Sequence, residues 1–323
     1  MEEYHYLLDL ALILFTTKLF GLISQKFKMP QVVGALLAGL ILGPAVLNIV
    51  QKSNFITTTS EIGVIILMFC AGLETDVKEL KKCGKASFVI ALLGVIVPLL
   101  GGFGVAYFFN QPGIIDSGAT CNVFLQNVFI GVILTATSVS ITVETLKELG
   151  RLKSESGNAI LGAAIIDDIL GIIALTVITS LADSSVNVWI VLLKILGFFA
   201  MVIVAGFAFY KLYVWWANRS KHLRHRHAII CFVFCLGMSY AAEALFGVAD
   251  ITGAFFAGLI ISLTQSSEYL AKKFDVLSYL LLSPIFFASI GLNVVLPSMS
   301  VQIIVFAVVI TIVAIITKII GCG

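Results

Sequence analysis

Two adjacent acids, Asp167 and Asp168, lie in the middle of an apolar stretch that runs from Ile160 to Leu175. A carboxylate near the middle of a bilayer costs about 2.5–3.5 kcal/mol on insertion scales, so a chain that keeps two side by side is expected to use them. Consecutive residues of a helix point about 100° apart, so these side chains cannot make the same contact. We expect one acid to face a cavity and the other to face a neighbouring helix.

A lysine and a run of hydroxyl side chains could complete a polar site. Lys318 is the one basic residue well inside the late apolar segments, and a buried lysine needs a counter-ion, for which Asp167 or Asp168 is the natural candidate. Residues 135–142 are rich in Thr and Ser, whose hydroxyls can satisfy the backbone groups that a broken helix leaves free. Such a break would offer oxygen ligands to a small cation, although hydroxyls also form ordinary bonds between membrane helices.

Composition defines the elements that must position these groups. Of the 323 residues, 60% are hydrophobic and 12% are charged, and the mean hydropathy is +1.10. A globular domain carries about 25% charged residues. Apolar runs near the length that crosses a bilayer recur from end to end, and they are continuous, which excludes a transmembrane barrel. We therefore predict an all-α polytopic membrane protein. Its eleven apolar segments are residues 5–24, 30–50, 58–74, 84–109, 126–147, 155–182, 187–217, 227–246, 248–265, 275–293 and 301–323.

The loop charges predict an orientation. Fifteen Lys and Arg residues follow the odd-numbered segments, whereas the loops after the even-numbered segments hold Lys52 alone. Because cytoplasmic loops carry the excess of Lys and Arg, the odd loops are expected inside and the N-terminus outside. Two acids at the inner end of the third segment, Glu74 and Asp76, could attract cations at a funnel mouth, although a solvated helix end is the simpler explanation.

The chain also contains an internal repeat. Residues 34–41 and 253–260 share the pattern Gly-Ala-x-x-Ala-Gly-Leu-Ile at an offset of 219, and the same offset places Gly72-Leu73 on Gly291-Leu292. The matched segments are the second and the ninth, and an odd step reverses direction, so we predict an inverted-topology repeat of the kind found in secondary transporters. The repeat predicts thirteen helices, with the last two near positions 345–366 and 374–401, beyond Gly323.

Four segments resemble one transporter family. The segments 135–146 and 162–171, which carry Thr-Ala-Thr-Ser and Asp-Asp, are similar to those of bacterial sodium/proton antiporters of the second monovalent cation:proton antiporter family, within the cation:proton antiporter superfamily. Residues 69–76 and 283–293 resemble the same family. The resemblance covers almost all of the chain, and it implies a membrane transporter, not an enzyme, without cofactor or nucleic-acid partner, in the cell membrane of a prokaryote.

The resemblance implies two domains in each protomer of a homodimer. A scaffold domain would form the dimer, and a core domain with two crossed, broken helices would carry the ion across the bilayer in an elevator motion. By this comparison residues 1–77 and 227–293 belong to the scaffold, residues 84–183 and 300–323 to the core, and residues 187–217 form a linker helix. The second crossed helix is expected beyond Gly323.

The resemblance also assigns roles residue by residue. Asp168 would bind the exchanged cation and the proton in turn, Asp167 would pair with Lys318, and Thr137 and Ser138 would lie at the helix break. The Asp-Asp form resembles electrogenic members of the family. The transported ions would be H⁺ and Na⁺, with K⁺ or Li⁺ as other possible cargo, so that Na⁺ is a transient ligand of Asp168.

Three alternatives remain open from the sequence. A potassium/proton antiporter or K⁺ efflux system could use the same fold. An intramembrane aspartyl protease needs two carboxylates about 3 Å apart, and such enzymes bring them from separate helices, unlike the adjacent pair in this chain. A symporter for an organic anion could share the repeat architecture, but acids in mid-membrane disfavour an anionic substrate.

Overall fold

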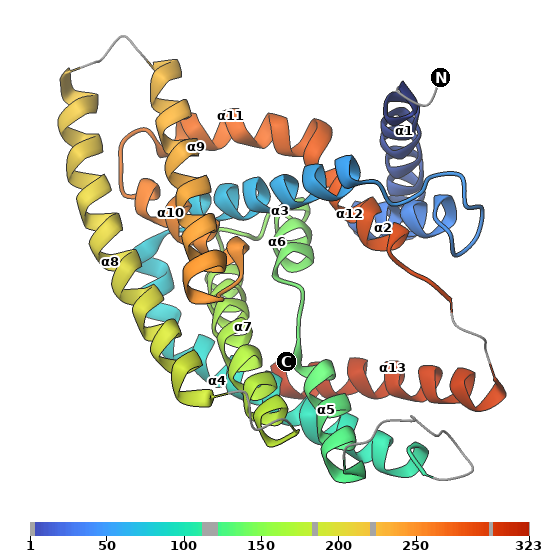
Figure 1. The fold of residues 1–323 in the computed structure, drawn as a ribbon. Coiled ribbons are helices and arrows are strands. Elements are labelled where there is room, and N and C mark those ends of the chain that lie inside the picture. The colour runs from blue at the N-terminus through green and yellow to red at the C-terminus, as the bar shows by residue number, and fades with distance from the viewer. Residues whose placement is uncertain (1–3, 112–121, 183–186, 220–223, 297–299, 323) are drawn as a thin grey trace. The chain divides into compact units, whose positions relative to one another are not determined.

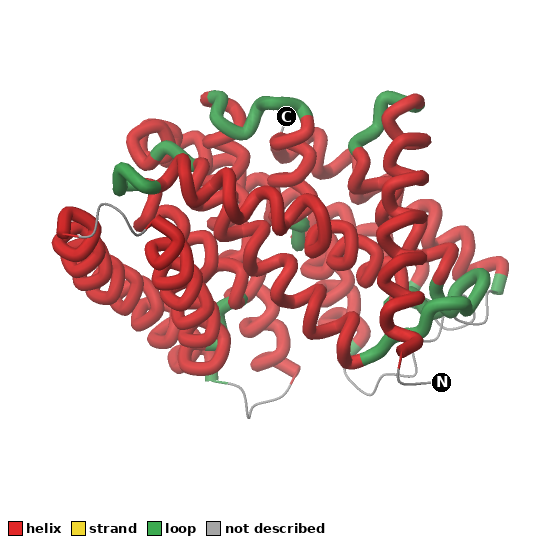
Figure 2. The backbone as a smooth tube through the Cα atoms, turned by 90° about the horizontal axis from the view of Figure 1, so that it is seen from above, coloured by secondary structure: helices red, strands yellow, loops and turns green. Residues whose placement is uncertain are grey.

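A computed structural model describes residues 4–111, 122–182, 187–219, 224–296 and 300–322 of the chain. Every regular element in these ranges is helical, as Figures 1 and 2 show. Nine of the described helical segments are long and apolar enough to cross a membrane, and two further apolar helices are shorter. The prediction of an all-α chain is therefore confirmed for the described residues.

The helices follow the predicted apolar segments with four main differences. The fourth segment, predicted to begin at residue 84, begins at Val77 as helix α4. The fifth segment is two helices, α5 and α6, and the second is only 12 residues long as a helix. The predicted loop before residue 275 is the helix α11, which buries Leu270, Ala271 and Phe274 on one face. The described helices are α1 His5–Lys26, α2 Gln31–Leu42, α3 Asn54–Glu74, α4 Val77–Phe109, α5 Val123–Thr135, α6 Val139–Glu148, α7 Glu155–Ala182, α8 Val188–Arg219, α9 Arg224–Tyr240, η2 Ala241–Leu245, α10 Asp250–Ser262, α11 Ser267–Leu277, η3 Ser278–Leu282, α12 Ser283–Leu292 and α13 Val301–Cys322.

The chain divides into two compact units, each assembled from separate stretches of sequence. Unit 1 consists of Met1–Val77, Ser140–Ser154 and Ala200–Leu296. Unit 2 consists of Lys78–Val139, Glu155–Phe199 and Pro297–Gly323.

Within unit 1, the sequence repeat is also a repeat of packing. A Cβ added to Gly39 in α2 would lie 2.0 Å from the carbonyl oxygen of Ala288, so no side chain fits there. A Cβ added to Gly258 in α10 would lie 2.3 Å from the carbonyl oxygen of Phe69. The offset of 219 maps Gly39 onto Gly258 and Phe69 onto Ala288. The same backbone contact is therefore made twice, once by each copy of the repeat.

A second pair of contacts obeys the same rule. A Cβ on Gly291 would lie 2.4 Å from the Leu36 carbonyl oxygen, and a Cβ on Gly72 would lie 2.2 Å from the Phe255 carbonyl oxygen. The offset again maps each contact onto the other. In both cases a short helix of one copy packs against a helix of the other copy, α2 on α12 and α10 on α3. The two copies are thus interlocked through glycines that let the backbones approach closely.

Unit 2 is held together by close contacts of the long helix α4. A Cβ on Gly131 of α5 would lie 2.5 Å from the Leu99 carbonyl oxygen, and a Cβ on Gly321 of α13 would lie 2.8 Å from the Leu93 carbonyl oxygen. The Ser87 hydroxyl donates to the carbonyl oxygen of Ala159 in α7 at 3.0 Å. Helix α4 therefore contacts α7 and α13, which carry Asp167, Asp168 and Lys318, and α5, which ends just before Thr137 and Ser138.

Candidate functional site

The site begins with an interruption of the helix that the sequence placed at residues 126–147. Helix α5 ends at Thr135 and α6 begins at Val139, so Ala136, Thr137 and Ser138 belong to neither helix. Ala136 has extended backbone angles, φ −63° and ψ 125°. The break expected from the Thr- and Ser-rich composition is confirmed. Carbonyl groups at the end of α5 have no partner within the helix and need one from elsewhere.

Lys318 of α13 supplies that partner. Its Nζ donates to the carbonyl oxygen of Thr135 at 2.6 Å, to the hydroxyl of Thr137 at 2.5 Å and to the carbonyl oxygen of Gly94 at 3.0 Å. A lysine ammonium has three N–H donors, and three acceptors surround this one. The C-terminal end of a helix carries partial negative charge, so a cation is favourable at the end of α5.

Asp167 also lies near the same ammonium. The distance between Lys318 Nζ and Asp167 Oδ2 is 3.8 Å, with the two side chains 24% and 7% exposed. Thr137 also hydrogen-bonds to Asp167 through its side chain and its backbone N–H. The buried Oδ1 of Asp167 has no hydrogen-bond partner among the described residues. The structure thus brings three of the predicted site residues together, one from each of three segments.

Asp168 has different surroundings, although it is the next residue. Its side chain is half-buried in α7. No hydrogen bond or ion pair joins it to another residue in the described part of the chain, and Asp167 is the charged group that interacts with it. The two acids point about 100° apart on the helix and therefore have different partners. Asp167 interacts with Lys318 and Thr137, and Asp168 is open.

Two predicted site residues, Thr137 and Ser138, are exposed at the break. Sequence reasoning missed Gly94, whose carbonyl oxygen is the third acceptor for Lys318. A signal for it was present in the sequence, because Pro98 follows Gly94 by four residues and lacks the N–H that would occupy that carbonyl in an ordinary helix.

Glu74 and Asp76 both belong to unit 1. The Glu74 carboxylate lies 3.7 Å from Nζ of Lys147, and Lys147 also pairs with Asp275 of α11. Asp76 is exposed after the end of α3. The sequence did not predict the pairing of Glu74 with a lysine of α6, and a role of these acids in attracting cations stays a prediction.

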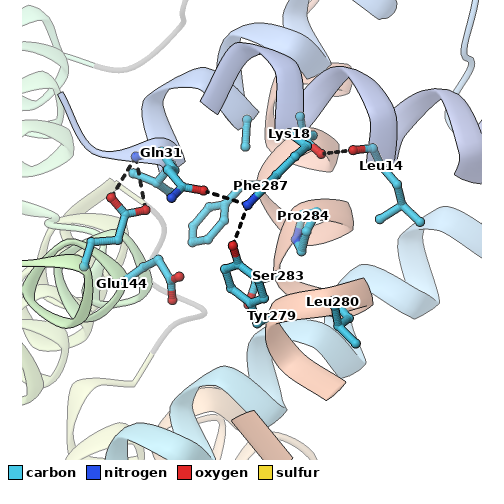
Figure 3. Close-up of a pocket in the computed structure, with 13 residues that line it drawn as sticks. Leu14, Lys18, Gln31, Glu144, Tyr279, Leu280, Ser283, Pro284 and Phe287 are labelled. Atoms are coloured by element: carbon cyan, nitrogen blue, oxygen red, sulfur yellow. Dashed lines mark hydrogen bonds between the residues drawn. The ribbon is translucent and has the colours of Figure 1, made fainter. Parts of the chain in front are cut away.

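Unit 1 also contains a cavity of about 310 Å³ at α1, α2, α6, η3 and α12 (Figure 3). The Lys18 ammonium donates to the hydroxyl of Tyr279 at 2.5 Å, and the Gln31 backbone N–H donates to the Glu148 carboxylate at 2.8 and 3.1 Å. Glu148 therefore stabilises the beginning of α2. The predicted site residues are not among those that line this cavity.

A permanent metal centre is not indicated in the described ranges, which contain no group of three or more His, Cys, Asp and Glu side chains able to hold a metal ion. The arrangement at Asp167 and Asp168 instead provides one charge-compensated carboxylate and one open carboxylate, next to backbone and hydroxyl oxygens. Such a site can exchange a proton for a small cation.

The fold has a counterpart among solved structures of transporters. The chain matches the structure of the sodium proton antiporter MjNhaP1 from Methanocaldococcus jannaschii with a TM-score of 0.72 and 22% sequence identity, over 99% of this chain and 78% of that one. This likeness shows that the chain has the fold of an antiporter.

The sequence comparisons define the family. Residues 11–322 match the family model described as "Sodium/hydrogen exchanger, transmembrane", and the chain belongs to this family. It is 39% identical to the Na(+)/H(+)-K(+) antiporter GerN of Bacillus cereus, over 99% of this chain and 80% of that protein. It is 38% identical to the Na(+)/H(+) antiporter of Enterococcus hirae, over 97% of this chain and 79% of that protein.

Family membership confirms several of the predictions from sequence. The protein is a multi-pass integral membrane protein that exchanges monovalent cations for protons, and it is a transporter, not an enzyme. The protease and organic-anion alternatives are thereby excluded. The resemblance to sodium/proton antiporters, inferred from the Thr-Ala-Thr-Ser and Asp-Asp motifs, is confirmed as well.

Proposed function

We propose that the protein exchanges Na⁺ for H⁺ electrogenically, with Asp168 as the group that binds the cation and the proton in turn. The observation that carries this proposal is the difference between the two acids. Asp167 is engaged by Lys318 and Thr137, whereas Asp168 has no partner in the described part of the chain. An open carboxylate can bind either ion but not both, so the cation enters only after the proton has left.

In this proposal Asp167 and Lys318 explain why exchange moves net charge across the membrane. A cation that arrives at Asp168 also reaches the field of Asp167 and competes with Lys318 for it. When Lys318 then gives up its proton, two protons leave for one Na⁺ and net charge crosses the membrane. Thr137 and Ser138, at the end of α5, supply oxygen atoms that replace part of the hydration shell of the ion.

The architecture supports an alternating-access mechanism in which one unit moves against the other. Asp167, Asp168, Thr137 and Lys318 all belong to unit 2, which we assign as the core domain. Unit 1, with its interlocked repeat, is assigned as the scaffold that forms the homodimer. The excess of Lys and Arg in the odd loops supports an outside N-terminus, with Glu74 and Asp76 attracting cations from the cytoplasm.

The proposal is tested in proteoliposomes that contain the full-length protein and an internal pH-sensitive dye. Addition of NaCl or LiCl should drive proton movement, and an imposed membrane potential should change its rate. Asp168→Asn should abolish cation-driven proton movement. Wild-type rates in that variant would refute the assignment of Asp168, and rates independent of the membrane potential would refute electrogenic exchange.

A second candidate, K⁺/H⁺ exchange, is supported by the name of the GerN relative, which includes K⁺. The same proteoliposomes separate the two, because KCl would replace NaCl as the effective salt. Proton movement driven by KCl alone would overturn the choice of Na⁺.

A further inference from the structure

We propose that Pro98 is a positioning residue of the transport site, because it leaves the Gly94 carbonyl oxygen free to hold the Lys318 ammonium. The inference rests on the proposed function in one point, that Lys318 and Asp167 belong to the transport site. Pro98 itself touches no ion, and it acts through Lys318.

The first step of the argument is the hydrogen bonding of α4. In an α-helix the carbonyl of residue i accepts from the N–H of residue i+4, and a proline in the interior removes that bond. Pro98 lies inside α4 and is buried. The carbonyl oxygen of Gly94, four residues earlier, cannot receive the usual helical bond, and a buried carbonyl without a partner is costly.

The second step is the partner that this carbonyl finds. Lys318 Nζ lies 3.0 Å from the Gly94 oxygen, within the ordinary range for an N–H···O hydrogen bond. Lys318 also donates to Thr135 and Thr137 at the end of α5. Two orphaned carbonyls, one freed by a proline and one freed by a helix end, are therefore bridged by a single ammonium.

The third step is the close packing that lets the lysine reach α4. A Cβ on Gly321 would lie 2.8 Å from the carbonyl oxygen of Leu93, and a Cβ on Gly94 would lie 2.9 Å from the Sγ atom of Cys322. The backbones of α13 and α4 thus meet one helical turn beyond Lys318. At this distance the lysine side chain reaches the Gly94 carbonyl while it stays beside Asp167.

The consequence for transport follows from charge. The Gly94 carbonyl is one of three acceptors of the Lys318 ammonium, and the titratable groups that face this ammonium are Asp167 on α7 and Cys322 on its own helix. When Lys318 gives up its proton in the proposed exchange, only two N–H donors remain for the three acceptors. Loss of this acceptor should allow exchange to begin at lower pH.

The test is Pro98→Ala in the full-length protein. Alanine restores an N–H at position 98, so the Gly94 carbonyl can return to the helix and Lys318 loses an acceptor. We expect the pH midpoint of Na⁺-driven proton movement, and of thermal stabilisation by Na⁺ in detergent, to fall by roughly 0.5–1 pH unit. The control is Leu100→Ala, which removes a 62% exposed side chain from the same helix and should leave the midpoint unchanged.

A double-mutant cycle with Lys318→Gln distinguishes the possible outcomes. Its readout is thermal stabilisation by Na⁺, which can be measured even when the Lys318→Gln variant does not transport. A shift by Pro98→Ala that disappears in the Lys318→Gln background supports the inference. No shift, or the same shift in both backgrounds, overturns it. If Lys318→Gln alone leaves the pH profile unchanged, the proposed role of Lys318 fails instead. Thermal unfolding checks the fold, because alanine is favourable inside a helix and Pro98→Ala should not lower stability.

Discussion

The ammonium of Lys318 lies 2.6 Å from the carbonyl oxygen of Thr135, the last residue of α5. One side chain from near the end of the sequence thus caps the first half of an interrupted membrane segment. The same ammonium lies 3.8 Å from Asp167, which is too far for a hydrogen bond but close enough for strong charge interaction. Lys318 is therefore a structural cap as well as a counter-charge, and the two roles make separable predictions.

The first prediction compares Lys318→Gln with Asp167→Asn. Removal of Lys318 leaves the Gly94 and Thr135 carbonyls and a 7% exposed carboxylate without their cation, whereas removal of the Asp167 charge leaves Lys318 with three acceptors. Breaking a buried pair costs about 3–5 kcal/mol. Lys318→Gln should therefore lower the midpoint of thermal unfolding in detergent more than Asp167→Asn does. The exposed Lys194 of α8 provides the control Lys194→Gln, and equal losses in the two site variants would contradict the capping role.

The second prediction concerns the duplicated glycine contacts. Gly39→Ala and Gly258→Ala would each place a Cβ within 2.3 Å of a backbone carbonyl oxygen, which the helices can relieve only by moving apart. Overpacking of this kind costs about 1–3 kcal/mol or more. Both variants should reduce thermal stability and the yield of monodisperse protein. Gly237→Ala in α9 meets no atom within 4 Å and should be neutral. A neutral result at Gly39 or Gly258 would mean that the two copies are not interlocked there.

The third prediction concerns the ion pairs of Lys147, which link α6 to the end of α3 and to α11 within unit 1. Lys147→Gln removes the pairs with Glu74 and Asp275, and the side chains of Lys147 and Glu74 are only 26% and 18% exposed. We expect a loss of about 1 kcal/mol, largest at low salt, because exposed pairs are worth less and salt screens them. The control Lys82→Gln removes a pair whose lysine is 71% exposed and should change stability little. Equal effects of the two variants would show that the Lys147 pairs contribute no more than a surface contact.

The fourth prediction tests the orientation in the membrane. Lys52, between α2 and α3, and Lys153, between α6 and α7, are both exposed and lie in loops that the charge distribution places on opposite sides. In a cysteine-free background, Lys52→Cys should react with a membrane-impermeant maleimide on intact cells. Lys153→Cys should react only after the cells are opened. The reverse pattern would place the N-terminus inside.

Much of the fold could be predicted because membrane helices leave strong signals. The apolar runs predicted the spans, and the Thr- and Ser-rich stretch predicted the break before Val139. The offset of 219 predicted a repeat, but only the structure shows that glycines of one copy contact the backbone of the other. The amphipathic helix α11 was missed because its residues are partly polar, as those of a loop are. It is too short and too polar to be recognised as a membrane span.

The candidate site was only partly predictable, for a physical reason. Charged and hydroxyl side chains are easy to recognise in an apolar sequence, so Asp167, Asp168 and Lys318 could be found from their residue types alone. The third acceptor for Lys318 is a backbone carbonyl, which every residue has. Only the four-residue spacing of Gly94 and Pro98 indicates that this carbonyl is free. That spacing points to a site only when Lys318 is known to lie nearby.

The interlocked repeat of unit 1 has a consequence for biosynthesis. The glycines of α2 and α3 close onto carbonyls of α12 and α10, which are made much later. During translation the small-residue faces of the first copy's helices therefore remain without their partners in the bilayer until the second copy has been synthesised. Contacts of such long sequence separation slow folding and lengthen exposure to wrong partners. Quality-control proteases and insertases would encounter an intermediate in which only the first copy is inserted, and the rate of elongation sets the lifetime of this intermediate.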